Sequence, residues 1–373
     1  MKILLAGGGT GGHILPTLAV AKALKAKLPE VELLYIGSKR AEDRQLVESA
    51  GINFRSISTG KLRRYFSFEN VADVVRFWMG IWEAGRILGK FKPQVVFAKG
   101  GFVSLPVVLA AKKLEIPVIV HESDSHLGLS NRMALKSAKK LAVAWPIQTY
   151  WQNASNLGKY ADKFVYTGLP MVEELLNWRG EKLFDNDKPM ILVTGGSQGA
   201  QTINVTVWEV LNKLLREYNV VHQTGNLDME RANQIKENLA PEIKNSYMPF
   251  AFDRNIFLAG LHQADLVVSR SGSFIFELAV LGKVAILIPL LGSANDHQRK
   301  NAEALAKDGA AVMIAPELLN GEGLVNTISA LMMDNNKRKN LSEKISRFGQ
   351  YSRQAARTIA ELIIEVAHGK EIN

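Results

Sequence analysis

Residues 1–24, MKILLAGGGTGGHILPTLAVAKAL, join an apolar run to an amphipathic run through a glycine-rich segment. The apolar run is typical of a buried strand, and the spacing after His13 predicts a helix. Five of the seven residues in GGGTGGH, residues 7–13, are glycine. Glycine lets a ligand approach the main chain, and a helix N-terminus offers unpaired N–H groups that attract anions. The stretch therefore predicts a phosphate site, since a purely structural turn would need fewer glycines.

The familiar phosphate loops match this segment only in part. A Walker loop needs Lys and then Ser or Thr after its last glycine, where this sequence has His13. Gly7, Gly9 and Gly12 satisfy the dinucleotide-binding pattern. The next strand, however, ends in GSKR, residues 37–40, without the acidic residue that binds the NAD ribose. The sequence therefore argues against ATP bound in a Walker loop and against NAD, and leaves NADP as an alternative.

The composition is that of a folded chain long enough for two domains: 373 residues, 47% hydrophobic and 22% charged. The absence of cysteine excludes disulfides and thiolate metal sites. No apolar run approaches the roughly 18 residues of a membrane-spanning helix, and we expect no signal peptide. The formal net charge of +10 predicts an anionic partner. Nucleic acid, acidic lipid and a phosphorylated substrate all meet that requirement.

The pattern of strand, glycine loop and helix occurs twice. PMILVTGGSQGAQTINVTVWEVL, residues 189–211, repeats it, and further units of similar form cover 94–122 and 264–290. Such alternation predicts parallel sheets with crossover helices. We therefore predict an α/β protein of two doubly wound Rossmann-like domains, with ligands at the carboxyl ends of the strands and a deep cleft between the domains. Glycine loops in both halves favour two phosphate-rich ligands, such as a nucleotide-sugar donor and a phosphorylated acceptor.

Six motifs, in this order, resemble those of the MurG family of glycosyltransferases. They are GGGTGGH at 7–13, GGFVS at 100–104, HES with LGLSN within 121–131, GGSQGA at 195–200, RSGS with Glu277, and DHQRKNA at 296–302. The resemblance covers nearly the whole chain and implies the GT-B fold of family 28. It also implies an inverting transfer of GlcNAc from UDP-GlcNAc to the C4 hydroxyl of the MurNAc of lipid I. The product would be lipid II, for peptidoglycan synthesis, cell shape and cell division.

The sequence pattern and the resemblance together predict how the chain is organised. Residues 1–166 are expected to bind lipid I and dock on the membrane, residues 167–345 to bind UDP-GlcNAc, and 346–373 to form a helix that packs back on the first domain. We expect a peripheral protein on the cytoplasmic face of the plasma membrane. Its expected partners are UDP-GlcNAc, lipid I, an anionic membrane surface and other cell-wall synthesis proteins, without nucleic acid.

The donor contacts implied by the resemblance lie mostly in the second half. Ser197 is expected at the UDP diphosphate, and Glu277 at the ribose hydroxyls, since a carboxylate can accept two hydrogen bonds. Gln298 is expected at the GlcNAc hydroxyls, with Asn301 as its neighbour, and the backbone near Ala251 at the uracil. Alternatively, Glu277 is an ordinary helix carboxylate, and Gln298 and Asn301 are merely solvated.

Asn131 is expected to reach the sugar from the first domain, although it could instead cap a helix. Two positions depart from the family pattern. Val172 stands where the family usually has an Arg for the donor phosphates. The segment before Glu277 is one residue short, which affects the backbone contacts expected of Ser273 and Phe274.

The acceptor side is expected near the first glycine loop. The residues placed close to the acceptor diphosphate are Thr10, Gly11 and Gly12. His13 is the candidate general base, because the positive end of a helix dipole lowers the pKa of an imidazole and keeps it neutral. A structural or phosphate-binding role for His13 is the alternative, and His121 or Glu122, at the end of the strand IPVIVHE, could assist the acceptor hydroxyl instead.

No metal is expected. Asp185-Asn186-Asp187 has the D-x-D spelling of metal-dependent glycosyltransferases, but it precedes the strand MILVT, on the opposite side from the glycine loop. We interpret it as a surface turn. Helix N-termini can stabilise a departing phosphate without a metal, so no cofactor is required beside the donor UDP-GlcNAc.

Residues 58–93 carry the membrane prediction. Three cations alternate with aromatic rings, which favours the lipid interface: Lys61, Arg63, Arg64, Tyr65, Phe66 and Phe68. A second set follows helical spacing: Val71, Val74, Val75, Trp78, Met79 and Trp82. Core packing explains this second set at least as well as membrane contact does.

Three other functions remain open on the sequence. Another UDP-sugar enzyme, such as a glycolipid synthase or a sugar epimerase, would use the same fold. An NADP-dependent oxidoreductase and a nonenzymatic nucleic-acid binder are the alternatives from other classes.

Overall fold

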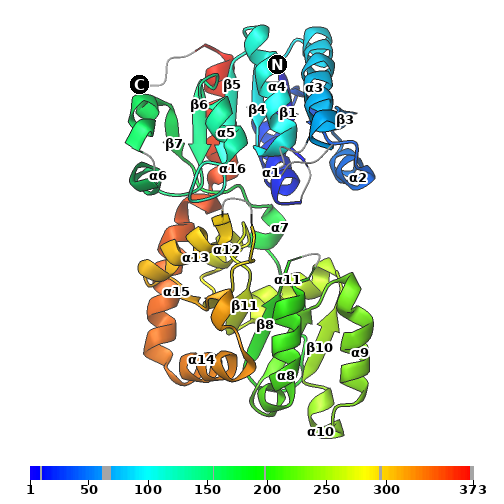
Figure 1. The fold of residues 1–373 in the computed structure, drawn as a ribbon, viewed down its shortest axis with the longest axis vertical. Helices are drawn as coiled ribbons and strands as arrows, with labels where there is room; N and C mark the ends of the chain where they lie inside the picture. The colour runs from blue at the N-terminus through cyan, green and yellow to red at the C-terminus, as the bar shows by residue number, and fades with distance from the viewer. Residues whose placement is uncertain (9–10, 61–68, 154, 197–198, 294–295, 370–373) are drawn as a thin grey trace. The chain divides into compact units, whose positions relative to one another are not determined.

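The computed structural model describes residues 1–8, 11–60, 69–153, 155–196, 199–293 and 296–369. The chain divides into two compact units, Met1–Glu173 with Tyr351–Asn373, and Glu174–Gln350. Each unit is a parallel sheet with helices packed on it (Figure 1). The predicted α/β class and the two doubly wound, Rossmann-like sheets are confirmed.

The sheet of the first unit has the order β3-β2-β1-β4-β5-β6-β7 in the described residues. Its strands are β1 (Lys2–Ala6), β2 (Glu32–Gly37), β3 (Asn53–Ser56), β4 (Val95–Ala98), β5 (Val118–Glu122), β6 (Lys140–Val143) and β7 (Phe164–Tyr166). The chain runs from β1 outward to β3 and then returns to β4 on the other side of β1, with Ala6 opposite Ala98. Doubly wound sheets bind ligands at this kind of switch point.

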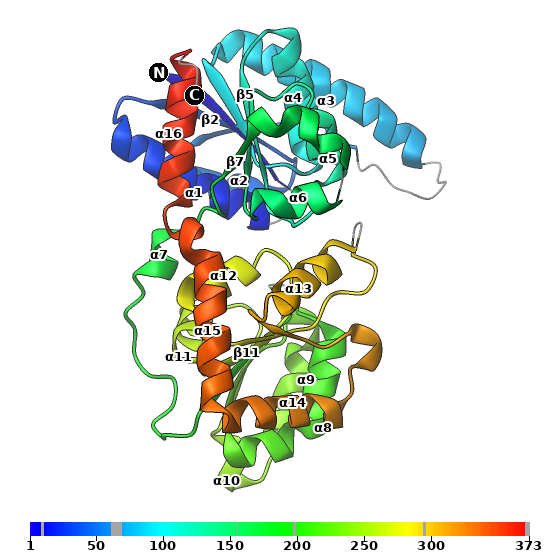
Figure 2. The same cartoon turned by 90° about the vertical axis from the view of Figure 1, so that its left-hand side faces the viewer.

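Helices of the first unit bury apolar faces against this sheet. They are α1 (Gly11–Lys27), α2 (Ala41–Ser49), α3 (Glu69–Phe91), α4 (Gly101–Lys113), α5 (Leu129–Ala134), α6 (Ile147–Asn153), η1 (Ser155–Lys163) and α16 (Ala355–Ala367). Although α16 comes from the end of the chain, it lies beside α1, as Figure 2 shows. Ile359 and Ile363 of α16 join Ile14 and Leu24 of α1 in one buried cluster. The C-terminal helix therefore belongs to the core of the first unit.

The second sheet repeats the arrangement with the order β10-β9-β8-β11-β12-β13 in the described residues. Its strands are β8 (Met190–Thr194), β9 (Asn219–Gln223), β10 (Tyr247–Phe250), β11 (Leu266–Ser269), β12 (Ala285–Leu287) and β13 (Val312–Met313). Its helices are α7 (Glu173–Leu176), α8 (Gln201–Glu217), η2 (Asn226–Asp228), α9 (Met229–Glu237), α10 (Pro241–Lys244), α11 (Arg254–Gln263), α12 (Ile275–Leu281), α13 (His297–Lys307), η4 (Pro316–Leu318), α14 (Gly321–Met333) and α15 (Asn335–Gly349). The switch point of this sheet lies between β8 and β11.

The expectation of one helix from Ser346 onward is wrong. Helix α15 ends at Gly349, a 3-10 turn follows at Gln350–Arg353, and α16 begins at Ala355. Gly349 packs so closely on α12 that an added Cβ would lie 2.4 Å from the carbonyl carbon of Ala279. The amphipathic spacing continues through this break, so the sequence alone did not reveal it.

Candidate active site

The switch point of the second unit begins with the glycine loop after β8. The N–H of Gly196 donates to Thr194 Oγ1 at 3.0 Å. A Cβ on Gly195 would lie 2.3 Å from Ala200 Cβ, and one on Gly199 would lie 2.0 Å from the carbonyl oxygen of Thr224. Close packing therefore requires glycine at positions 195 and 199, whether or not the loop also binds phosphate. Ser197, the predicted diphosphate contact, lies outside the described residues.

Glu277 lies in the first turn of α12, at the carboxyl edge of the same sheet. Burial raises the pKa of its carboxyl to about 7, and the nearby charge of Arg254 opposes that rise. Such a carboxyl is half ionised near neutral pH. Glu277 therefore differs from an ordinary solvated helix carboxylate.

The segment after β10 approaches the start of α12. Ala251 directly follows Phe250, the last residue of β10, and Asp253 caps α11 by accepting a hydrogen bond from the N–H of Ile256 at 2.9 Å. The rings of Phe257 and Phe274 lie 5.6 Å apart between centroids. The structure therefore brings the predicted uracil segment to the same edge of the sheet as Ser273, Phe274 and Glu277.

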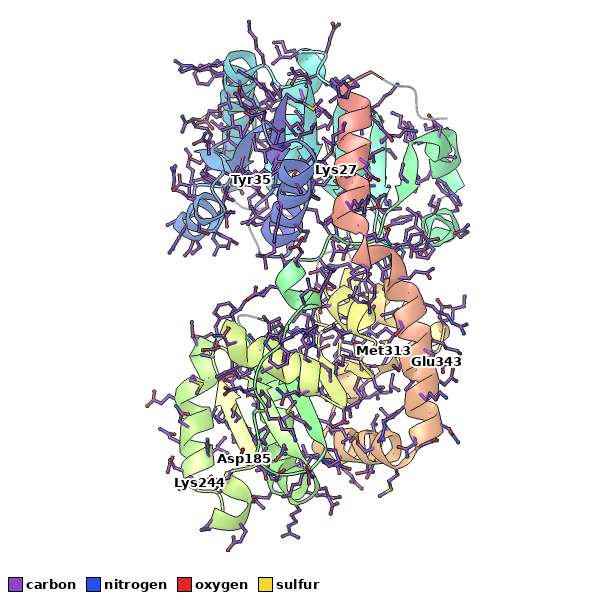
Figure 3. All side chains as sticks on the ribbon, turned by 180° about the vertical axis from the view of Figure 1, so that it is seen from behind. Lys27, Tyr35, Asp185, Lys244, Met313 and Glu343 are labelled. Atoms are coloured by element: carbon purple, nitrogen blue, oxygen red, sulfur yellow. The ribbon has the colours of Figure 1, made fainter. Side chains whose placement is uncertain are left out.

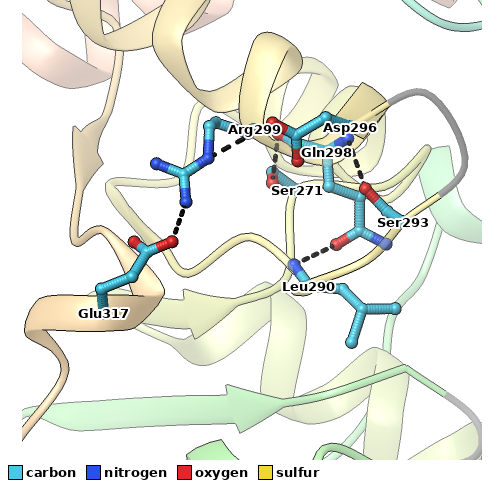
Figure 4. Close-up of polar contacts among 7 residues, drawn as sticks. All are labelled: Ser271, Leu290, Ser293, Asp296, Gln298, Arg299 and Glu317. Carbon is cyan, nitrogen blue, oxygen red and sulfur yellow. Dashed lines mark hydrogen bonds and ion pairs between the residues drawn. The ribbon is translucent and has the colours of Figure 1, made fainter.

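Gln298 and Asn301 lie in the first two turns of α13. Asn301 is buried, so the alternative that it is merely solvated is wrong, whereas Gln298 is partly buried. Figure 4 shows the Gln298 amide oxygen accepting from the N–H of Leu290 at 3.0 Å. Asn301 is completely buried and donates to the carbonyl oxygen of Ser271 at 3.2 Å. The Ser271 hydroxyl donates in turn to the carbonyl oxygen of Gln298 at 2.7 Å. Asn301 therefore fixes the loop after β11, and Gln298 lies beside it.

Ion pairs hold the start of α13 in place. Arg299 contacts Glu317 of η4 and also lies 3.4 Å from a carboxylate oxygen of Asp296 (Figure 4). Asp296, with φ of 55°, has a left-handed backbone that is uncommon outside glycine. These contacts fix the first turn of α13, where Gln298 lies.

In the first unit, His13 lies in the first turn of α1, directly after the first glycine loop. The pKa of its imidazole is lowered to about 4 by burial, and further by the positive charge of Lys99. The predicted neutral imidazole is consistent with this shift, but burial and Lys99 are its main causes. Gly11 and Gly12 begin the same helix, whereas Thr10 lies outside the described residues.

Glu122, the last residue of β5, is a fully engaged carboxylate. One oxygen accepts from the N–H groups of Ser123 and Asp124 at 2.9 and 3.0 Å. The other accepts from the N–H of Gly128 at 2.8 Å and from Asn131 Nδ2 at 3.0 Å. These four hydrogen bonds hold the loop after β5, which supports a positioning role for Glu122.

Asn131 and His121 are buried beside this carboxylate. Asn131 lies inside α5, whose N-cap residue is Gly128, so the interpretation of Asn131 as a helix cap is wrong. Its amide also donates to the carbonyl oxygen of His121 at 3.0 Å. His121 Nε2 lies 3.0 Å from the carbonyl oxygen of Gly168, so this nitrogen carries the proton. Burial and the charge of Lys99 hold the pKa of His121 well below its ordinary value.

The D-x-D segment lies away from both switch points. Asp185, labelled in Figure 3, is exposed and precedes β8 at the amino end of that strand. Asn186 exchanges hydrogen bonds with the side chain of Asn219, at the start of β9. The segment therefore contributes to a turn at the edge opposite the glycine loop. Within the described ranges, no group of three or more His, Asp or Glu side chains is arranged to hold a metal ion.

The aromatic face of α3 is exposed, so the interpretation of its stripe as core packing is wrong. Trp78 is 65% and Trp82 66% exposed, and the other exposed members are Val74, Val75 and Met79. The opposite side of α3 packs through Ala84 and Leu88, which are completely buried. No helix among the described residues is long and apolar enough to cross a membrane. The preceding basic and aromatic residues, 61–68, lie outside the described residues.

Both units also match one family. Residues 3–143 match the Glycosyltransferase family 28 N-terminal domain, and residues 190–362 match the Glycosyltransferase family 28 C-terminal domain. The chain belongs to glycosyltransferase family 28. The resemblance predicted from the six motifs and the enzyme class are thereby confirmed.

Relatives of this family 28 chain are similar to it along their whole length. A Clostridium perfringens protein is 38% identical, with 98% of this chain and 99% of the relative covered. A Bacillus cereus protein is 36% identical, with the same two shares covered. The first is named UDP-N-acetylglucosamine–N-acetylmuramyl-(pentapeptide) pyrophosphoryl-undecaprenol N-acetylglucosamine transferase, and the second carries the same name followed by the number 2.

Solved structures agree with the family 28 fold. MurG of Acinetobacter baumannii superposes with a TM-score of 0.73 at 25% identity, covering 98% of this chain and 99% of that one. A UDP-GlcNAc 2-epimerase from Neisseria meningitidis has a TM-score of 0.70 at 15% identity, covering 98% of this chain and 100% of that one. The second likeness shows the shared fold alone.

The residue that sequence reasoning missed is Lys99. It directly follows β4 at the switch point of the first sheet and is only 1% exposed. The sequence feature that could have identified Lys99 as a site residue is its position between the apolar strand VVFA and the two glycines of GGFVS. A lysine at a strand end is usually solvated, so that signal was not decisive.

Proposed function

We propose that this chain transfers GlcNAc from UDP-GlcNAc to the C4 hydroxyl of the MurNAc of lipid I, giving lipid II for peptidoglycan synthesis. The observation that carries this proposal is the full-length similarity, at 36–38% identity, to proteins named for that transfer. A glycine loop at the switch point of each sheet supports it, because donor and acceptor both carry a diphosphate.

The second unit is the proposed donor domain. Its glycine loop and Ser197 bind the UDP diphosphate, and Glu277 accepts hydrogen bonds from the ribose. The segment at Ala251 binds uracil, and Gln298 binds the sugar beside the loop after β11, which Asn301 fixes. The partly buried side chain of Arg270, after β11, supports this assignment because it offers the donor phosphates a positive charge where Val172 offers none.

The first unit is the proposed acceptor domain. Thr10, Gly11 and Gly12 lie at the acceptor diphosphate, and His13 takes the proton from the C4 hydroxyl as that oxygen attacks the anomeric carbon and UDP leaves. Two features favour His13 over Glu122. Burial and Lys99 lower the pKa of the His13 imidazole to about 4, which keeps it neutral, and the Glu122 carboxylate accepts four hydrogen bonds from its own loop and from α5. Asn131 reaches the sugar from beside that loop.

We propose that the helix N-termini and nearby cations balance the charge of the departing UDP, without an essential metal. The proposed location is the cytoplasmic face of the plasma membrane, as a peripheral protein working with other cell-wall synthesis proteins. The exposed face of α3 is the proposed membrane contact, because its tryptophans suit the lipid interface. The Arg86 guanidinium lies 5.8 Å from the Trp82 ring centroid and adds a cation beside it.

Transfer of radiolabelled GlcNAc from UDP-GlcNAc to a lipid I analogue tests the function. A labelled disaccharide product is expected only when both substrates are present. Conversion of UDP-GlcNAc to its C2 epimer without any acceptor would instead indicate an epimerase, the activity named for a neighbour of the same fold. Absence of both products would contradict the proposal.

A further inference from the structure

Lys99 is a buried cation that makes no hydrogen bond from its ammonium group within the described part of the chain. Its backbone N–H donates to the carbonyl oxygen of Ala6 at 2.9 Å, which ties the end of β4 to the end of β1. A buried ammonium without a partner is costly, and such groups are rare in folded proteins. A group of this kind at a switch point requires an explanation from function.

The surroundings of Lys99 are those of a site. Its charge is close enough to His13 and His121 to lower the pKa of both imidazoles. Glu122 and Asp124 are in turn close enough to raise the pKa of Lys99 itself. Burial outweighs those carboxylates and lowers the Lys99 pKa to about 8. The two carboxylates therefore compensate the ammonium only in part.

The glycines of the two loops on each side of Lys99 are closely packed. An added Cβ on Gly7 would lie 3.4 Å from Lys99 Cβ, and one on Gly101 would lie 3.3 Å from His13 Cε1. Gly100 and Gly101 have φ of 96° and 79°, where side chains are unfavourable. The Ser104 hydroxyl donates to the carbonyl oxygen of Gly100 at 2.7 Å and fixes the second loop. Both loops thus converge on the stem of Lys99.

We propose that Lys99 binds the diphosphate of the lipid-linked acceptor and sets the preference of the enzyme for a diphosphate-bearing acceptor. This rests on the proposed function. Lysine binds phosphate as a point charge, and the incoming anion supplies the partner that the ammonium lacks. The ammonium is covered in the free protein, so the side chain turns on its four-carbon stem to meet the phosphate. No hydrogen bond to the described residues has to break for that turn.

Kinetics of Lys99→Met test the proposal. We expect the KM for a lipid I analogue to rise about 10-fold to 100-fold, the range for one hydrogen bond to a charged group, while the KM for UDP-GlcNAc stays unchanged. The KM for an analogue with a monophosphate in place of the diphosphate should rise much less. The ratio of the two acceptor KM values should therefore be closer to one in Lys99→Met than in the wild type. Lys113→Met is the matched control, because Lys113 is exposed at the other end of α4.

Two further measurements separate binding from folding. With saturating UDP in the donor site, inorganic pyrophosphate should displace a bound lipid I analogue from the wild type and much less from Lys99→Met. The thermal midpoint of Lys99→Met should rise or stay constant, because Met removes a buried charge and keeps the volume.

The outcomes distinguish the two levels of the proposal. A wild type that transfers GlcNAc to neither acceptor would contradict the proposed function. An active Lys99→Met enzyme with unchanged acceptor KM and unchanged displacement of the lipid I analogue by pyrophosphate would overturn only the role of Lys99. A lower thermal midpoint with equal losses for both substrates would also overturn it, and would assign Lys99 to a structural ion pair with the loop after β5.

Discussion

Replacing Trp78 and Trp82 with Ser tests whether α3 contacts the membrane. A tryptophan that becomes fully buried removes about 150–250 Å² from water. Because about two thirds of each side chain is already exposed, roughly 100–170 Å² of each is available to lipid. At about 25 cal/mol per Å², complete insertion would contribute about 2.5–4 kcal/mol per ring, and insertion to half depth about 1.5 kcal/mol.

The double variant should therefore lose about 3 kcal/mol of membrane affinity, or about 100-fold in the partition coefficient. Co-sedimentation with vesicles containing anionic lipid measures this loss directly. The thermal midpoint should not change, since neither ring lies in a core cluster of the described residues. Solution-phase GlcNAc transfer to a short-chain acceptor should also be retained.

The control replaces two leucines of the second unit, Leu227 and Leu318, which are 94% and 72% exposed. Their change to Ser removes exposed apolar surface without touching α3 and should leave vesicle binding intact. Equal losses in the control and in the tryptophan variant would show that binding depends on general hydrophobicity. Unchanged sedimentation of the tryptophan variant would refute a membrane role for this face.

Three other predictions concern the proposed chemistry. Glu277→Gln should weaken donor binding by about 1.5–3 kcal/mol and remove the pH dependence of donor affinity. In the wild type, donor affinity should rise from pH 6 to pH 8, because the Glu277 carboxyl, with a pKa of about 7, becomes ionised and accepts hydrogen bonds from the ribose. Titration with UDP at each pH measures this affinity. The same pH dependence in both proteins would count against this contact. His13→Ala should lower kcat about 10²-fold to 10⁴-fold with little change in the KM for UDP-GlcNAc, and a kcat that barely moves would exclude His13 as the base. Transfer should persist in EDTA, whereas complete loss that Mg²⁺ restores would establish a metal requirement.

The sequence predicted the sheets and the position of most candidate residues because both follow from local patterns. Strand, glycine loop and helix alternate visibly, and parallel sheets place every loop of that kind at one edge. Glu277 and Gln298 therefore lie at the carboxyl edge of the second sheet, as the motif order implied. Neither their roles nor that of Ser197 follows from position alone, so these stay predictions.

Features that depend on neighbours were not predictable from the sequence. The spacing of Trp78 and Trp82 showed that they share a face of α3, but only the fold shows that the described residues leave this face exposed. The lowered pKa of His13 was expected from a helix dipole, whereas its main causes are burial and Lys99. Lys99 directly follows β4, far from residues 7–13 in the sequence.

The two units place a cation at the same point of their topology. Lys99 directly follows β4, which lies beside β1 across the first switch point, and Arg270 directly follows β11, which lies beside β8 across the second. Burial lowers the pKa of both side chains, so each unit holds a partly desolvated charge. An apolar residue would fill either position without that cost. A cation retained in both halves is expected where each half receives a phosphate, which is what a diphosphate donor and a diphosphate acceptor provide.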